Sequence, residues 1–129
     1  MMKKAVFIGR YSPFHKGHLE IMKEKIRAGV SLLIMIRNTD YDYYTASERR
    51  EMIIEALRAI GADAEVIIIP DIESVNYGRG VGYEINEIEV SEEIKGISAT
   101  NIRELIKKND DSWRDFMPIG THEIILAKR

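Results

Sequence analysis

The sequence contains no cysteine among its 129 residues, which excludes a disulfide framework and thiolate metal ligands. Its uninterrupted apolar runs reach about six residues, whereas a membrane-spanning helix needs about 20. Neither sign of charge is in excess, because 19 Lys and Arg residues oppose 21 Asp and Glu residues, for a net charge of −2. Proteins that bind nucleic-acid backbones are usually basic, so nucleic acid is disfavoured as the partner.

These absences favour a soluble, cytoplasmic protein with neither a membrane nor a nucleic-acid partner. The apolar fraction of 45% and the charged fraction of 31% are ordinary for a globular chain. No repeat or low-complexity linker divides the sequence, so a single domain over residues 1–129 is expected. Self-association stays open, because a small sheet with short edges gains from it.

The first half alternates short apolar runs with stretches of helical spacing. The apolar runs predict buried strands at residues 5–8, 31–36 and 65–69. Helical spacing predicts one helix over residues 16–28 and a second after Thr45, where Glu48 completes a capping box. This order predicts an α/β fold with a doubly wound parallel sheet in three α/β/α layers.

The second half is less regular. Residues 71–82 predict a loop with glycines at 78, 80 and 82, and residues 83–90 predict an extended segment. A third helix is expected over residues 99–108 and a short helical turn over 112–117. Residues 123–127 fit either a helix or a strand.

The chemistry concentrates where the first strand meets the first helix. Gly9 ends the strand there, and the following helix start offers unpaired N–H groups and the positive end of its dipole, which together favour a phosphate. His15 and His18 are three residues apart, so both can point from the first helical turn toward one place. Ligands of open parallel sheets bind beyond the carboxyl ends of the strands, which is where this turn lies.

Neighbouring residues suit the same chemistry. Arg10 and Lys16 add positive charge, and Gly17 leaves room for a ligand near the backbone. The arrangement suits the transfer of a phosphoryl or nucleotidyl group, where electrostatics and positioning carry most of the catalysis. A metal site is the alternative, but His122 is the one remaining histidine and no cysteine could complete it.

A second cluster lies far along the chain. Ser98 and Thr100 are of the type that caps a helix start, where they offer donors to a phosphate. Arg103, one turn into that helix, can bind the same phosphate through its forked guanidinium. The alternative is an ordinary capped helix with a surface arginine.

Both clusters resemble a known family. Residues 9–18, Gly-Arg-Tyr-Ser-Pro-Phe-His-Lys-Gly-His, resemble the signature of the HxGH nucleotidyltransferase superfamily, and their spelling is most similar to the archaeal type of nicotinamide mononucleotide adenylyltransferase. Residues 97–103, Ile-Ser-Ala-Thr-Asn-Ile-Arg, are similar to that family's Ile-Ser-x-Thr-x-x-Arg. Residues 44–53 and 113–118 resemble two further segments, so the resemblance covers nearly the whole chain in order.

The resemblance implies a Rossmann-like fold and an enzyme that moves AMP from ATP to a phosphate-bearing acceptor and releases pyrophosphate. It implies catalytic roles for His15, His18 and Arg103. It also implies that Mg²⁺ arrives with the triphosphate rather than on a protein metal site. The expected nucleotide-binding residues are Gly9, Arg10, Tyr11, Lys16, Gly17, Ser98 and Thr100, and the expected acceptor-binding residues are Arg49 and Arg37.

Alternatives remain open. A cytidylyltransferase acting on a small phosphorylated alcohol and a non-catalytic nucleotide-binding module both fit the fold. Archaeal-type relatives carry a helix and a strand after the third strand, where this chain has an abbreviated segment from Glu73 to Tyr83. That departure leaves the acceptor undetermined. The choice of ATP over CTP is also undetermined. The glycine-rich loop at residues 78–82 is either a flexible loop or part of the acceptor pocket.

Overall fold

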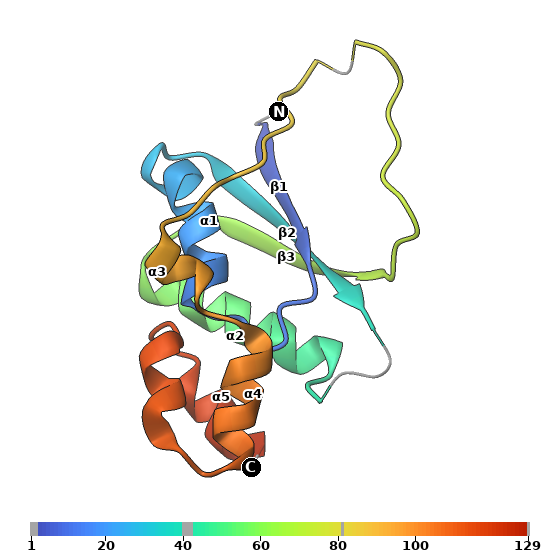
Figure 1. Cartoon of the computed structure of the whole chain (residues 1–129). Helices are drawn as coiled ribbons and strands as arrows, with labels where there is room; N and C mark the ends of the chain where they lie inside the picture. The colour runs from blue at the N-terminus through green and yellow to red at the C-terminus, as the bar shows by residue number, and fades with distance from the viewer. Residues whose placement is uncertain (1–2, 40–42, 81, 129) are drawn as a thin grey trace.

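A computed structural model describes residues 3–39, 43–80 and 82–128. Its centre is a three-stranded parallel sheet in the order β1-β2-β3. Helix α1 (Lys16–Arg27) joins the first two strands and α2 (Ala46–Ala59) joins the second to the third (Figure 1). The strands are β1 (Lys4–Gly9), β2 (Ser31–Asn38) and β3 (Ala64–Pro70).

Local sequence signals fix where these helices begin. The Thr45 hydroxyl accepts from the amide N–H of Glu48, and the Glu48 carboxylate accepts from the amide N–H of Thr45, so the predicted capping box is confirmed. At α1 the capping residue is His15. Each capping arrangement satisfies helix N–H groups that would otherwise lack partners.

The second half is helical. It contains α3 (Glu92–Lys95), α4 (Ala99–Lys107), the 3-10 turn η1 (Asp111–Phe116) and α5 (His122–Lys128). The predicted third helix and short helical turn are confirmed, and the C-terminal segment forms a helix rather than a strand. Helix α3 was not predicted from the sequence. The described residues between Asp71 and Val90 form no helix or strand, so the loop is confirmed and the extended segment pairs with no strand.

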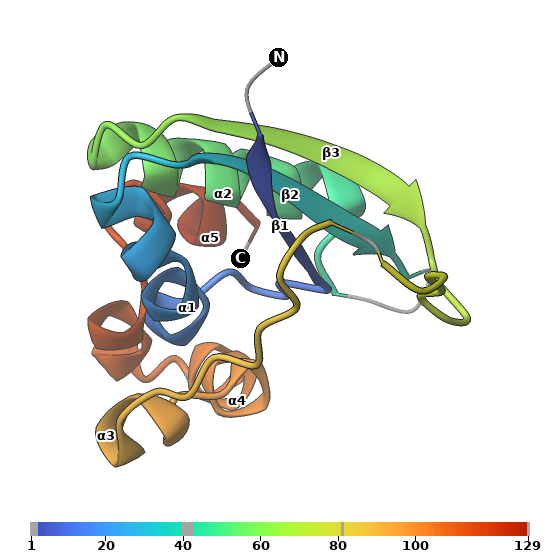
Figure 2. The same cartoon turned by 90° about the horizontal axis from the view of Figure 1, so that it is seen from above.

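One face of the sheet forms the core. The buried residues Leu32, Ile34 and Ile36 share this face of β2, and register places Ile34 beside Phe7 and Val66. Figure 2 shows α1, α2 and α5 on the same side of the sheet. Both crossovers run in the same direction along the sheet, and right-handed crossovers then place both helices on one face.

The opposite face is not covered by any helix among the residues that the structure describes. Val6 and Ile8, which point to it from β1, are 51% and 40% exposed. The α/β class with a parallel, Rossmann-like sheet is confirmed, whereas the described residues form two of the three expected layers. The reason lies after β3, where the glycine-rich segment lacks the apolar spacing that a covering helix needs.

The helices of the described structure are short compared with a membrane span. The longest helix, α2, has 14 residues, whereas a membrane span needs about 20. Among the residues that the structure describes, no helix is long and apolar enough to cross a membrane.

Candidate active site

The turn between β1 and α1 is held by an aromatic ring. Tyr11 has a left-handed backbone, with φ of 54°, and its ring lies over Gly9. A Cβ at Gly9 would lie 2.8 Å from Tyr11 Cζ, so the glycine makes this ring position available. The Tyr11 ring also meets His18 edge to face at 5.0 Å, and its burial raises the pKa of the phenol.

His15 and His18 bind each other through the backbone. His15 Nδ1 accepts from the amide N–H of Gly17 at 3.0 Å and of His18 at 3.4 Å. The amide N–H of His15 donates to His18 Nδ1 at 3.1 Å. Because both Nδ1 atoms act as acceptors, the proton of each neutral imidazole is on Nε2. Both side chains therefore present an Nε2–H donor.

Burial keeps these imidazoles neutral. It lowers the pKa of His15 to about 4, and it lowers the pKa of His18 to about 3 with help from the adjacent His15. The two rings are stacked with centroids 3.7 Å apart, and Phe14 stacks on His18 at 5.7 Å. At neutral pH the pair thus acts as two fixed, uncharged hydrogen-bond donors.

The missing side chain of Gly17 makes room for the imidazole of His15 and not for a ligand. A Cβ at Gly17 would lie 2.8 Å from His15 Cε1 and 3.0 Å from His15 Nδ1. The imidazole of His15 therefore takes the volume that the sequence analysis reserved for a ligand. The glycine spacing of the motif lets the first histidine fold back over the helix start.

The second motif reaches the same turn. The Arg103 guanidinium donates through Nη1 to the carbonyl oxygen of Ser12 and through Nη2 to Thr100 Oγ1 at 3.3 Å. Ser98 caps α4, because its Oγ accepts from the amide N–H of Asn101 at 3.1 Å. Residues 91 positions apart in sequence are thereby joined at the turn that leads into His15.

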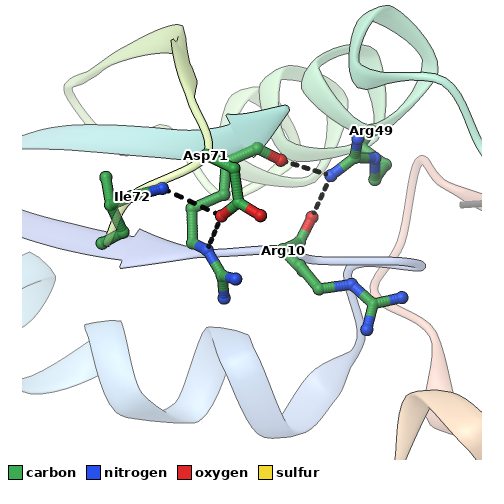
Figure 3. Close-up of polar contacts among 5 residues, drawn as sticks. Arg10, Arg49, Asp71 and Ile72 are labelled. Atoms are coloured by element: carbon green, nitrogen blue, oxygen red, sulfur yellow. Dashed lines mark hydrogen bonds and ion pairs between the residues drawn. The ribbon is translucent and has the colours of Figure 1, made fainter. Parts of the chain in front are cut away.

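Arg49 makes hydrogen bonds to the backbone at the carboxyl ends of β1 and β2. Its side chain is fully buried, and Nη1 donates to the carbonyl oxygens of Arg10 at 2.7 Å and Arg37 at 3.0 Å (Figure 3). Nε donates to the carbonyl oxygen of Tyr44 at 3.1 Å. Arg49 thus joins the carboxyl ends of β1 and β2 to the start of α2 and faces protein rather than solvent.

Arg37 pairs with a residue that the sequence analysis did not select. Its Nε lies 2.8 Å from Asp71 Oδ1, and the same oxygen accepts from the amide N–H of Ile72. The hydrogen bond from Arg37 is the main cause that lowers the pKa of Asp71. Its place in the sequence could have identified Asp71 as a candidate, because Asp71 directly follows β3, at the edge of the sheet where the other candidates lie.

The predicted residues therefore form two groups. Around the β1–α1 turn lie Gly9, Tyr11, His15, Gly17, His18, Ser98, Thr100 and Arg103, with Lys16 exposed at the first position of α1. At the strand ends lie Arg10, Arg37 and Arg49. Ser12 was also missed: its Oγ is buried and has no hydrogen-bond partner among the described residues.

A hollow elsewhere on the surface does not suit the binding of a phosphate. A hollow of about 400 Å³ between α2 and α5 is lined by Glu48, Glu51, Glu55 and Glu123. Four carboxylates repel a phosphate, so this hollow is not the site. Within residues 3–39, 43–80 and 82–128 no group of three His, Asp or Glu residues could hold a metal ion.

Comparison with known proteins identifies the family of this chain. A sequence model of the cytidylyltransferase-like family matches residues 6–88, and the chain belongs to this family of nucleotidyltransferases. Its relatives include the nicotinamide-nucleotide adenylyltransferases of Pyrobaculum neutrophilum and Methanococcus aeolicus. The first is 29% identical over 98% of this chain and 89% of its own length, and the second is 30% identical over 95% and 87%. These relatives favour adenylyl over cytidylyl transfer.

The alignments also show that the relatives contain additional residues. The Pyrobaculum alignment extends over 159 positions, more than the 129 residues of this chain, so that relative carries residues without a counterpart here. Among solved structures, the Francisella tularensis bifunctional NMN adenylyltransferase/ADP ribose pyrophosphatase, complexed with AMP and a manganese ion, is 32% identical. It matches 54% of this chain and 22% of that chain with a TM-score of 0.42.

Proposed function

We propose that this chain transfers AMP from ATP to the phosphate of nicotinamide mononucleotide and releases pyrophosphate. The observation that carries the proposal is the meeting of the two motifs, in which Arg103 binds the turn that leads into the His15–His18 pair. Two neutral Nε2–H donors and one guanidinium at a helix start form a cradle for a polyphosphate. The relatives that carry the name nicotinamide-nucleotide adenylyltransferase support the choice of both substrates.

In the reaction, an oxygen of the acceptor phosphate attacks the α-phosphorus of ATP. A bond forms between them, the bond from the α-phosphorus to the bridging oxygen breaks, and pyrophosphate leaves with that electron pair. The attacking phosphate is ionised at neutral pH, so no strong general base is required. His15, His18 and Arg103 stabilise the charge that grows on the bridging oxygen and on the pyrophosphate.

Divalent metal fits the proposal as a partner of the substrate. Because no set of three ligating side chains occurs among the described residues, Mg²⁺ would be held by the triphosphate oxygens. Bound there, it would neutralise phosphate charge. The protein's part is to orient the phosphates through the His15–His18 pair, Arg103 and the amides at the start of α1.

The roles proposed on the acceptor side concern three arginines, Arg10, Arg37 and Arg49. The side chain of Arg37 pairs with Asp71 at the carboxyl ends of the strands, where the acceptor phosphate would approach, and Arg10 directly follows the last residue of β1. Arg49 acts through backbone, because its donors bind the carbonyl oxygens of Arg10 and Arg37. Arg49 is thus proposed as a positioning residue for the acceptor side.

The experiment is a pyrophosphate-release assay that crosses ATP and CTP with three acceptors: nicotinamide mononucleotide, glycerol 3-phosphate and phosphopantetheine. Release with ATP and nicotinamide mononucleotide, with the dinucleotide product identified by mass spectrometry, is the expected result. Release only with CTP and glycerol 3-phosphate would establish the cytidylyltransferase alternative. Saturable ATP binding without pyrophosphate release from any pair would establish a non-catalytic module.

A further inference from the structure

The sheet has an apolar face and a strand edge that nothing in the described structure covers. Val6 and Ile8 of β1 point to this face, and register places them beside Leu33 and Met35 of β2, which are partly exposed. β1 is the last strand on its side, so its outer backbone N–H and C=O groups pair with no strand. Open edges and uncovered apolar faces of this kind are usually paired or covered in native proteins.

The same chain holds a matching segment. We define the crossover segment as residues 71–80 and 82–90, which connect β3 to α3 without helix or strand. Its large apolar side chains face solvent, with exposed fractions of 68% for Val75, 62% for Tyr77, 64% for Tyr83 and 63% for Ile85. From Tyr83 to Asn86 apolar and polar residues alternate, which places Tyr83 and Ile85 on one face of an extended chain. After Asn86 the alternation shifts by one residue, so Ile88 and Val90 lie on the other face.

The course of the chain brings the two together. Figure 1 shows the chain leaving β3, passing beyond the sheet to the level of the amino end of β1, and returning toward α3. The part of the crossover segment that leads to α3 therefore runs in the same direction as β1. A right-handed connection from β3 back to the outer side of β1 must cross the face opposite to α1 and α2, and that is the face of Val6 and Ile8.

We propose that residues 83–90 dock along β1 as a fourth parallel strand and that residues 72–80 cover the Val6–Ile8 face. The length suffices, because about 13 extended residues reach roughly 40 Å, whereas crossing three strands takes about 15 Å and returning along the six residues of β1 takes about 20 Å more. Ile88 and Val90 directly precede α3 and are already half-buried, so the docking movement concerns mainly residues 83–87. The strand order becomes β3-β2-β1 followed by the docked strand.

Docking would complete the substrate site, and in this respect the inference rests on the proposed function. In open parallel sheets the ligand crevice lies where strand order reverses. With the docked strand present, this reversal falls beside β1, next to Gly9 and the turn that holds the His15–His18 pair. A nucleotide and acceptor that contact both walls of this crevice bind the docked form more tightly, and so raise its population.

The chain's own segment is a better occupant than a second copy. It is tethered at both ends, so its local concentration at the β1 edge is in the millimolar range or higher, well above the concentration of a second protein molecule. It also supplies Val75, Tyr77, Tyr83 and Ile85, which would otherwise remain exposed. One movement thereby removes both apolar surfaces from water.

The absence of cysteine allows a direct test. The pair Val6→Cys and Ile85→Cys is treated with a short bifunctional maleimide, alone and with a non-hydrolysable ATP analogue plus nicotinamide mononucleotide. The matched control is Glu24→Cys with Ile85→Cys, since Glu24 is an exposed residue of α1 on the other layer. An internally crosslinked monomer is expected for the first pair alone. Its rate of formation should rise roughly tenfold with ligands, as when a state of about 10% population becomes the major one.

Other outcomes overturn the inference. Equal crosslinking in both pairs would mean an unstructured segment, and a crosslinked dimer would mean that a second copy pairs with β1. Hydrogen exchange of the unsubstituted chain provides a check free of substitutions: residues 83–90 should become protected when the two ligands bind, and unchanged exchange would refute docking. Pyrophosphate release is measured on the same samples. Release without crosslinking or protection refutes docking alone, whereas ligand-dependent crosslinking without release supports docking and refutes the proposed transfer.

Discussion

At the scale of single residues, the histidine motif gains its chemistry from backbone hydrogen bonds. The Nδ1 atoms of His15 and His18 accept from amides at the start of α1, which leaves both Nε2–H groups as donors. The sequence predicted that the two imidazoles would share a place. It could not predict that one ring would cap the helix and hold the other, because this depends on ring orientation rather than on spacing.

Removal of one of these donors should slow catalysis. We expect His18→Ala to lower turnover with ATP by about 10²–10³-fold, or about 3–4 kcal/mol, because one donor to the developing charge is lost. Pyrophosphate release under saturating substrates measures this. His122→Ala is the matched control, since His122 lies in α5 against Trp113 and outside the site. Turnover of His18→Ala within tenfold of the parent would remove this residue from the mechanism.

The low pKa values of the pair also predict how stability depends on pH. In the unfolded chain histidines titrate near pH 6.5, whereas in the folded chain the pKa of His15 is about 4 and that of His18 about 3. Between these values the unfolded state binds more protons, so the free energy of unfolding should fall as pH falls from about 6.5 toward 4. Urea unfolding at several pH values measures this fall.

A double variant, His15→Asn with His18→Gln, isolates the contribution of the histidines. Asn still supplies a capping acceptor at the start of α1, and the carboxylates of the chain are unchanged. The loss of stability between pH 6.5 and 4 should be smaller in this variant than in the parent. Equal losses in the two proteins would show that the imidazoles are not held neutral by the fold.

Arg49 shows what sequence spacing leaves undetermined. An arginine early in a helix could face solvent, the acceptor or the interior, and the structure buries it under the carbonyl oxygens of Arg10 and Arg37. Its burial depends on the convergence of two strand ends and a helix start, which only the assembled fold provides. Its role toward the acceptor stays a prediction.

Replacement of this arginine by lysine should destabilise the protein. A single ammonium cannot reach the carbonyl groups that the two ends of the guanidinium bind, so Arg49→Lys should lower the free energy of unfolding by about 2–3 kcal/mol. Chemical denaturation measures the change. The neighbouring Arg50→Lys is the control, because Arg50 makes one such bond, to the carbonyl oxygen of Val66, and is exposed. Equal losses for the two variants would contradict the positioning role.

At the scale of elements, local signals determined most boundaries. The capping box at Thr45 and the serine at position 98 placed the starts of α2 and α4, because both signals act within a few residues. Short α3 was missed because four residues carry too little periodicity to detect. The extended segment at residues 83–90 alternates apolar and polar residues only as far as Asn86, and pairing needs a partner strand that sequence alone does not position.

The glycine at the start of α1 gives a prediction at this scale. Gly17→Ala should favour the helix by propensity, but its Cβ would lie 2.8 Å from His15 Cε1 and displace that ring. Helix content by circular dichroism should therefore be preserved while turnover falls at least tenfold. Gly96→Ala serves as control, because its Cβ would meet nothing closer than 3.4 Å. Unchanged turnover in Gly17→Ala would contradict this geometry.

At the scale of the whole molecule, the three predicted strands are present, but the described residues form one of the two predicted helical layers. Three parallel strands and one helical layer followed from apolar runs and helical spacing. The second covering layer was expected from the doubly wound pattern, but residues between Asp71 and Val90 carry glycines and acidic side chains instead of helical spacing. The uncovered face therefore reflects the shortened connection after β3.

The residues of the two motifs, from opposite ends of the chain, should bind one polyphosphate, and NMR tests this most directly. The isotope-labelled protein is titrated with a non-hydrolysable ATP analogue and Mg²⁺, and the Nε2–H signals of His15 and His18 are followed together with the guanidinium signal of Arg103. The account predicts that all three shift along one saturation curve with a single dissociation constant. Shifts confined to the imidazoles, or to Arg103, would contradict it.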